Sequence, residues 1–128
     1  MAAVSLPISR QFLTRLTLAQ ERRLIRKAQS GSRKCRNEIV LRHVPFVARR
    51  VRKKVFPSLL RRYADELIAA SVPELCRKVS TYDLHYRDES GRPWPVPFAA
   101  YIWKRIDGFI VDYVKREGAR DRREGGAP

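Results

Sequence analysis

The last third of the chain carries an apolar pattern that limits its possible folds. Between about Pro97 and Arg116, apolar side chains recur every three or four residues, at Phe98, Ile102, Ile106, Phe109, Ile110 and Val114. This is the period of an α-helix with one buried face. No segment alternates apolar and polar residues convincingly, as a half-buried strand would. We therefore expect an all-α fold, a compact bundle of about five or six helices around a small core.

Capping residues mark the ends of the first helices. Thr17 and Gln20 have the spacing of a capping box, in which each side chain hydrogen-bonds a backbone N–H of the other residue. The helix that follows can end at Gly31, because glycine readily adopts the left-handed conformation found after helices. Ser32 is placed to cap the next helix, which contains Ile39 and Val40.

Prolines divide the middle of the chain. Because proline disrupts a helix interior but suits a first turn, we expect a break near His43–Val44 and a new helix from Pro45. Its core-facing residues are Val44, Val47, Val51 and Val55. Pro57 and Ser58 open another helix, which Pro73 should kink or restart. Residues 83–97 are predicted to form a loop, since they contain three prolines and a glycine.

The length of 128 residues indicates one domain. We expect an irregular lead over residues 1–15, a helical domain over 16–116 and a disordered, charged tail over 117–128. Cys35 and Cys76 are too few and too far apart for a zinc cluster or a disulfide framework, so we expect reduced thiols and no cofactor or metal. No segment has the ~20 apolar residues of a membrane span, and residues 1–10 do not resemble a signal peptide. These features predict a cytoplasmic protein with no membrane partner.

The charge balance points to a polyanionic partner. The chain has 28 Lys and Arg residues against 13 Asp and Glu residues, a net charge of +15. Nucleic acid is the most common partner of such a basic domain. A generally arginine-rich proteome is the competing explanation. His43 and His85 have no acidic or nucleophilic partner at a catalytic spacing, and no glycine-rich phosphate loop is present, so we do not expect an enzyme.

Three segments resemble bacterial sigma-70 family factors, from the end of region 1 through region 2. The first is LTLAQERRLIRKAQSGSRKCRNEIVLRHVPFVARRV, and the second is ADELIAASVPELCRKVSTYD. The third, FAAYIWKRIDGFIVDYVKR, is similar to the family's pattern of Phe-x-x-Tyr, Arg-Ile-x-Gly and Asp-x-x-Lys/Arg. Its members here are Phe98, Tyr101, Arg105, Ile106, Gly108, Asp112 and Lys115. The pattern is closer to the flagellar and stress-response groups than to primary factors.

The resemblance implies a transcription-initiation factor that binds core RNA polymerase and promoter DNA of the −10 type. Unpaired promoter bases stack on aromatic side chains, and cations contact phosphates. The candidate DNA-binding residues are Trp94, Phe98, Tyr101, Trp103, Lys104, Arg105, Lys115, Arg116, Arg49, Arg50 and Lys53. Helical aromatics often belong to the core instead, Trp94 could attach its loop to the core, and charged runs are often only solvated faces.

The resemblance also implies a polymerase-binding surface at Asp65, Glu66, Leu67 and Ala70. Such an acidic pair can instead simply favour a helix N-terminus. Ala70-Ser71 and Glu74 stand where the family usually has Glu-Gly and a second Gly, Pro73 replaces an apolar residue, and the 84–97 loop is longer than usual. Regions 3 and 4, which include the reader of the −35 element, are missing.

Two functional hypotheses follow from these departures. In the first, the chain docks on polymerase and reads or melts a −10-type element, with an anti-sigma protein or a companion −35-reading subunit as further partners. In the second, it is a regulator with the sigma fold that binds only duplex DNA or another protein and does not melt promoters.

Overall fold

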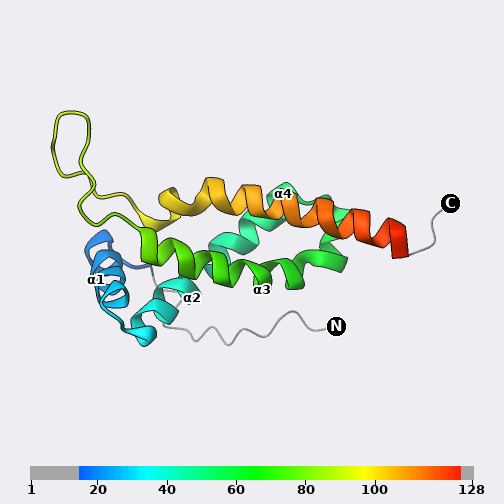
Figure 1. The fold of residues 1–128 in the computed structure, drawn as a ribbon, viewed down its shortest axis with the longest axis horizontal. Coiled ribbons are helices and arrows are strands. Elements are labelled where there is room, and N and C mark those ends of the chain that lie inside the picture. Colours follow the sequence, from blue (N-terminus) through cyan, green and yellow to red (C-terminus); the bar gives the residue numbers. More distant parts are fainter. Residues whose placement is uncertain (1–14, 125–128) are drawn as a thin grey trace.

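The computed structural model describes residues 15–124, which form a bundle of four helices (Figure 1). The helices are α1 (Leu18–Gln29), α2 (Arg33–Lys54), α3 (Pro57–Thr81) and α4 (Phe98–Glu124). The predicted all-α class is confirmed, but the expected five or six helices were too many for this part of the chain. Its only strand-like pairing is an isolated bridge between Arg87 and Pro93.

The predicted caps are present at the first two helices. The Thr17 side chain accepts a hydrogen bond from the Gln20 amide, and the Gln20 side chain accepts one from the Thr17 amide. Gly31 has a φ angle of 110°, as a residue after a helix end often has. Ser32 then caps α2 by accepting a hydrogen bond from the Cys35 amide at 3.2 Å. Local chemistry therefore sets these boundaries.

The expected break at Pro45 is wrong, because α2 continues from Arg33 through Pro45 to Lys54. Proline in a helix interior costs about 3 kcal/mol. Val44 before the proline and Val47 and Val51 after it are all at most 5% exposed. Burying each valine contributes about 1.5–3 kcal/mol, so keeping both halves of the helix on the core outweighs the local cost.

Pro73 likewise lies inside a continuous helix, so the expected restart at this residue is also wrong. Leu67 before it and Leu75 after it are fully buried, which keeps the two halves of α3 in register. Pro57 occupies the first turn of α3, as predicted. The break between α2 and α3 therefore occurs at the proline whose missing amide costs the helix nothing.

The core forms where α2 packs against each of the other three helices. The predicted stripe of α2 is buried, and so are Phe98, Ile102, Ile106 and Ile110 of α4. Phe109 and Val114 are only partly buried at its edge. α3 and α4 lie side by side along the long axis, and α1 covers one end of the bundle (Figure 1).

The start of α4 agrees with the predicted boundary, but its end lies further along the chain than predicted. The 83–97 segment is a loop, and it projects from the end of the bundle near α1 (Figure 1). α4 starts at Phe98 and runs to Glu124, so residues 117–124 are helical and the predicted boundary at Arg116 was too early. The rest of the predicted tail, 125–128, and the predicted lead up to residue 14 lie outside the described residues.

Candidate nucleic-acid interface

An exposed tryptophan lies between cations where α2 meets α4. Trp103 on α4 is 40% exposed, although Ile102 and Ile106 of the core stripe, which lie before and after it, are fully buried. The Arg50 guanidinium of α2 lies 5.6 Å from the centre of its ring, and the Lys104 ammonium lies at the same distance. We call Arg50, Lys54, Trp103, Lys104 and Asp107 the Trp103 cluster. It combines a stacking face with positive charge, as single-stranded nucleic-acid sites do.

Asp107 holds the cationic part of this cluster in place. Arg50 donates to both oxygens of the Asp107 carboxylate, with Nε 2.8 Å from Oδ1. The Lys54 ammonium lies 3.7 Å from the same carboxylate. The hydrogen bond from Arg50 is the main cause that holds the pKa of Asp107 below its usual value, although burial opposes it. The same hydrogen bond raises the pKa of Arg50.

Arg105, another predicted phosphate contact, also joins two helices. It donates to Oε1 of Glu74 on α3 at 2.7 Å, and Arg77 pairs with the other carboxylate oxygen. Glu74 is only 3% exposed, whereas the Arg105 side chain is 58% exposed. A buried carboxylate needs such partners, because an unpaired buried charge is strongly destabilising. Arg105 therefore has a structural role in addition to any contact with DNA.

Two predicted stacking residues pack against the bundle. Phe98 is fully buried, with its ring edge-on to His43 at 4.8 Å, so it is a core residue and not a surface platform. Tyr101 is partly buried, and its hydroxyl donates to the Thr81 carbonyl at 3.1 Å. The Lys78 ammonium lies 4.5 Å from the Tyr101 ring. Tyr101 is thus held against the end of α3.

Trp94 lies on the projecting loop, whereas the other predicted stacking residues are on α4. It is 58% exposed, so it does not attach the loop to the core. Its amide donates to the Tyr86 carbonyl at 3.0 Å, and this bond helps to order the two sides of the loop. The structure therefore does not bring Trp94 together with the Trp103 cluster through any direct contact.

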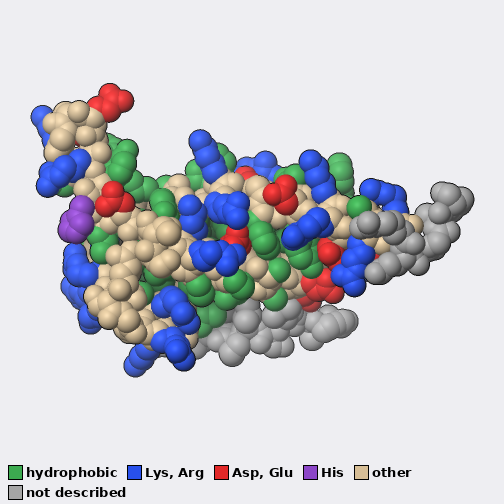
Figure 2. Space-filling view, in the orientation of Figure 1, with side chains coloured by type: hydrophobic (Ala, Val, Ile, Leu, Met, Phe, Trp, Pro, Cys, Tyr) green, Lys and Arg blue, Asp and Glu red, His purple; other side chains and the backbone are tan. Residues whose placement is uncertain are grey.

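The remaining predicted cations are exposed along two helices. Arg49 and Lys53 belong to the last turns of α2, and Lys115 and Arg116 to the second half of α4. Lys and Arg side chains gather along α4 and around the α1 end of the molecule (Figure 2). These positions permit phosphate contacts, whose number would set the salt dependence of binding.

The predicted polymerase-binding residues lie on α3. Glu66 is exposed and accepts a hydrogen bond from the Tyr113 hydroxyl at 3.2 Å, while Asp65 and Ala70 are half-buried. Leu67 is fully buried, so it supports this surface from the core instead of forming part of it. α3 begins at Pro57 and has no acidic residue in its first turn, which excludes the helix N-terminus as the reason for the acidic pair.

Sequence reasoning missed Asp107 and Glu74, the two acids that fix Arg50 and Arg105. Asp107 lies one helical turn after Trp103 and Lys104, and an acid at that spacing within a basic stripe was the available signal. Nothing in the sequence shows that Arg50 reaches it from another helix.

Residues 15–124 were also compared with the requirements of a disulfide, a metal site and a membrane span. Cys35 and Cys76 are free thiols. In this part of the chain, no group of His, Cys, Asp and Glu residues could hold a metal ion, and no helix is long and apolar enough to span a membrane. Comparison with protein-family models, curated proteins and solved structures finds no match to this chain.

Proposed function

We propose that this chain is a DNA-binding module of transcription initiation, similar in role to region 2 of sigma-70 family factors. The Trp103 cluster carries the proposal, because it presents an exposed indole between two cations on a chain of net charge +15. An unpaired base stacks on the indole, and Arg50, Lys104 and the other exposed cations contact the phosphates on either side. The proposal involves no catalytic step.

Core RNA polymerase is the proposed protein partner, through Asp65, Glu66 and Ala70 on α3. The order and spacing of the three segments that resemble the sigma family support this part of the proposal. A companion subunit that reads the −35 element is a further proposed partner.

The alternative function is binding of duplex DNA without melting. Burial of Phe98 and the Lys78 ammonium 4.5 Å from the centre of the Tyr101 ring favour it, because they reduce the aromatic surface that a melting factor could use for stacking. A duplex binder would contact phosphates through Lys104, Arg105, Lys115 and Arg116, and would leave Trp103 without a base to stack on.

Replacing Trp103 separates the two functions. Trp103→Ala should weaken binding to DNA with an unpaired bubble by about 1–3 kcal/mol, which is the value of stacking one base. Binding to closed duplex should change little, because phosphate contacts dominate there. Both affinities are measured by fluorescence titration at one fixed salt concentration.

Val111→Ala is the matched control, because Val111 is also 40% exposed on α4. It should leave both affinities unchanged. Equal losses on bubble and duplex for Trp103→Ala would contradict base stacking and favour the duplex-binding function. No measurable binding of the unaltered chain to either DNA would contradict both functions.

A further inference from the structure

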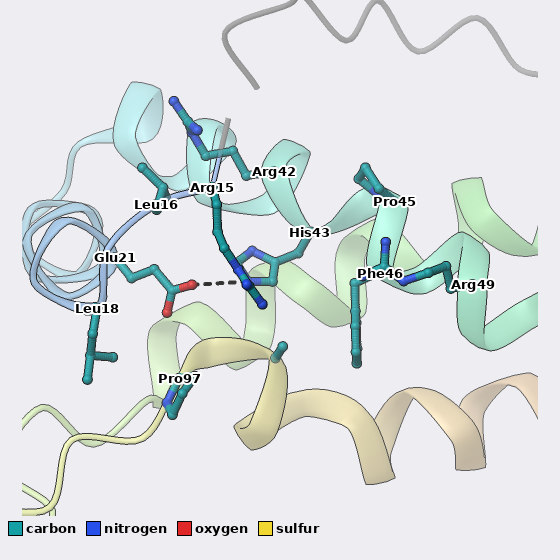
Figure 3. A pocket seen from close by; sticks show the side chains of 11 residues that line it. Arg15, Leu16, Leu18, Glu21, Arg42, His43, Pro45, Phe46, Arg49 and Pro97 are labelled. Atoms are coloured by element: carbon teal, nitrogen blue, oxygen red, sulfur yellow. Dashed lines mark ion pairs between the residues drawn. The ribbon is translucent and has the colours of Figure 1, made fainter. Parts of the chain in front are cut away.

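A cavity of about 740 Å³ lies where the start of α1, the middle of α2 and the start of α4 meet (Figure 3). This volume is within the range of small-molecule sites. The nucleic-acid interface shares one residue with it, Arg49. The cavity is therefore a candidate binding site separate from the nucleic-acid interface.

Apolar side chains line much of the cavity. Leu16, Leu18, Pro45, Phe46 and Pro97 line it, together with Ala99. Phe46 is only partly buried, and the Arg49 guanidinium lies 6.0 Å from the centre of its ring. A flat ring placed against Phe46 would gain stacking and would cover apolar surface at the same time.

Three cations, Arg15, Arg42 and Arg49, lie among these apolar side chains in the lining (Figure 3). Arg42 is paired with Glu38 at 3.2 Å. Among the described side chains, neither Arg15 nor Arg49 forms an ion pair with a carboxylate within 4.0 Å. A guanidinium presents its donors in a planar fork that matches phosphate oxygens, so these two residues suit an anionic ligand.

The one acid in the cavity is already satisfied. Glu21 accepts a hydrogen bond from the Phe98 amide at 3.0 Å, and its other oxygen lies 3.6 Å from Nε2 of His43. Burial tends to raise the pKa of Glu21, but the hydrogen bonds from His43 and Phe98 and the charge of Arg15 lower it overall. The Glu21 carboxylate thus has cationic and N–H partners within the protein, which leaves the cavity positive on balance.

We propose that this cavity binds a nucleoside phosphate, with the base against Phe46 and the phosphate between Arg15 and Arg49. Inorganic phosphate would leave the apolar side chains of the lining uncovered. A fatty acid would cover them, but its single carboxylate would offer less to two guanidiniums than a phosphate does. A nucleoside phosphate matches both the apolar and the cationic side chains of the lining, and this binding does not require the chain to bind DNA.

Titration calorimetry on the full chain tests the proposal with adenosine 5′-monophosphate, adenosine and inorganic phosphate at one ionic strength. The monophosphate should bind more tightly than either of its parts. Arg15→Gln and Arg49→Gln should each weaken its binding about tenfold, as expected for loss of one charged hydrogen-bonding partner. Arg52→Gln is the matched control, because Arg52 is exposed on α2 and does not line the cavity.

Phe46→Leu removes the ring while keeping an apolar side chain, and a melting curve verifies that each variant folds. Binding of the monophosphate no tighter than that of phosphate, or equal losses in Arg49→Gln and Arg52→Gln, would overturn the proposal. A dinucleoside monophosphate identifies the source of the ligand. If it binds as tightly and with the same dependence on Arg15 and Phe46, the cavity holds a nucleotide within a strand; if only the monophosphate binds, the ligand is a free nucleotide.

Discussion

Asp107→Asn should lower the stability of the protein and strengthen its binding to DNA. The substitution keeps the shape of the side chain but removes the charge that holds Arg50 beside Trp103. Breaking a fully buried ion pair costs about 3–5 kcal/mol, and breaking an exposed pair costs about 0–1 kcal/mol. The Arg50 and Asp107 side chains are 20% and 13% exposed, and asparagine retains one acceptor oxygen. We therefore expect a loss of about 1–2 kcal/mol in the free energy of unfolding.

The effect on DNA has the opposite sign. Without the carboxylate, Arg50 and Lys54 can both turn toward a phosphate. One additional phosphate contact steepens the slope of log affinity against log salt by about 0.9 on duplex DNA. Urea denaturation measures the stability change, and titrations at several salt concentrations measure the slope.

Asp112→Asn is the matched control. It makes the same change in net charge on the same helix, but Asp112 is exposed and forms no ion pair with the described residues. Its stability should stay within about 0.5 kcal/mol of the unaltered chain. If the two variants give the same salt slope, DNA does not contact the Trp103 cluster and the reasoning is refuted.

The ion pair also predicts a pH dependence. Because the pKa of Asp107 is lowered in the folded state, its contribution to stability is complete above the unfolded pKa of about 3.9. It is lost as the pH falls through the lower folded pKa. The stability difference between the unaltered chain and Asp107→Asn should therefore shrink in acid. A difference that stays constant down to pH 2 would place its cause elsewhere.

Three further predictions test other parts of the molecule. Phe98→Ala should lower the free energy of unfolding by about 3–5 kcal/mol in urea denaturation, because it leaves a cavity in the core; a loss below 1 kcal/mol would mean that the ring is not buried in solution. Tyr101→Phe should lower the free energy of unfolding by only about 0.5–1.5 kcal/mol, the value of its hydrogen bond to Thr81. Thermal melting of Phe98→Ala and Tyr101→Phe checks that the first variant loses more stability. Changing Asp65 and Glu66 to Lys should abolish co-purification of core polymerase while the far-UV helical signal persists; unchanged co-purification would move the docking surface elsewhere.

Local signals in the sequence were enough to predict the fold class and several boundaries. Thr17, Gln20 and Ser32 act through hydrogen bonds to amides three residues away, so their effect does not depend on the rest of the fold. The apolar stripe of α4 is a property of one helix, and the predicted burial of Phe98, Ile102, Ile106 and Ile110 is confirmed. Charge and aromatic content likewise identified Trp103 and its neighbouring cations as candidates, although their contact with DNA remains a prediction.

Tertiary packing decided the features that local rules predicted wrongly. Pro45 and Pro73 carry the same local cost as any helical proline. Only the buried residues on both sides of each proline explain why α2 continues through Pro45 and α3 continues through Pro73. Residues 117–124 look polar in the sequence, but Tyr63 donates a hydrogen bond to Asp121 and Arg62 pairs with it at 3.0 Å. These contacts from α3 help to order the last turns of α4.

The candidate sites depend most strongly on the tertiary structure. Arg50 meets Asp107 across 57 positions in the sequence, Arg105 meets Glu74 across 31, and Glu21 meets the Phe98 amide across 77. The sequence shows which of these side chains carry charge, but not which lie together. That is decided by how α1, α2, α3 and α4 pack, because apolar burial sets the helix positions and the charged groups must then find partners within the resulting geometry.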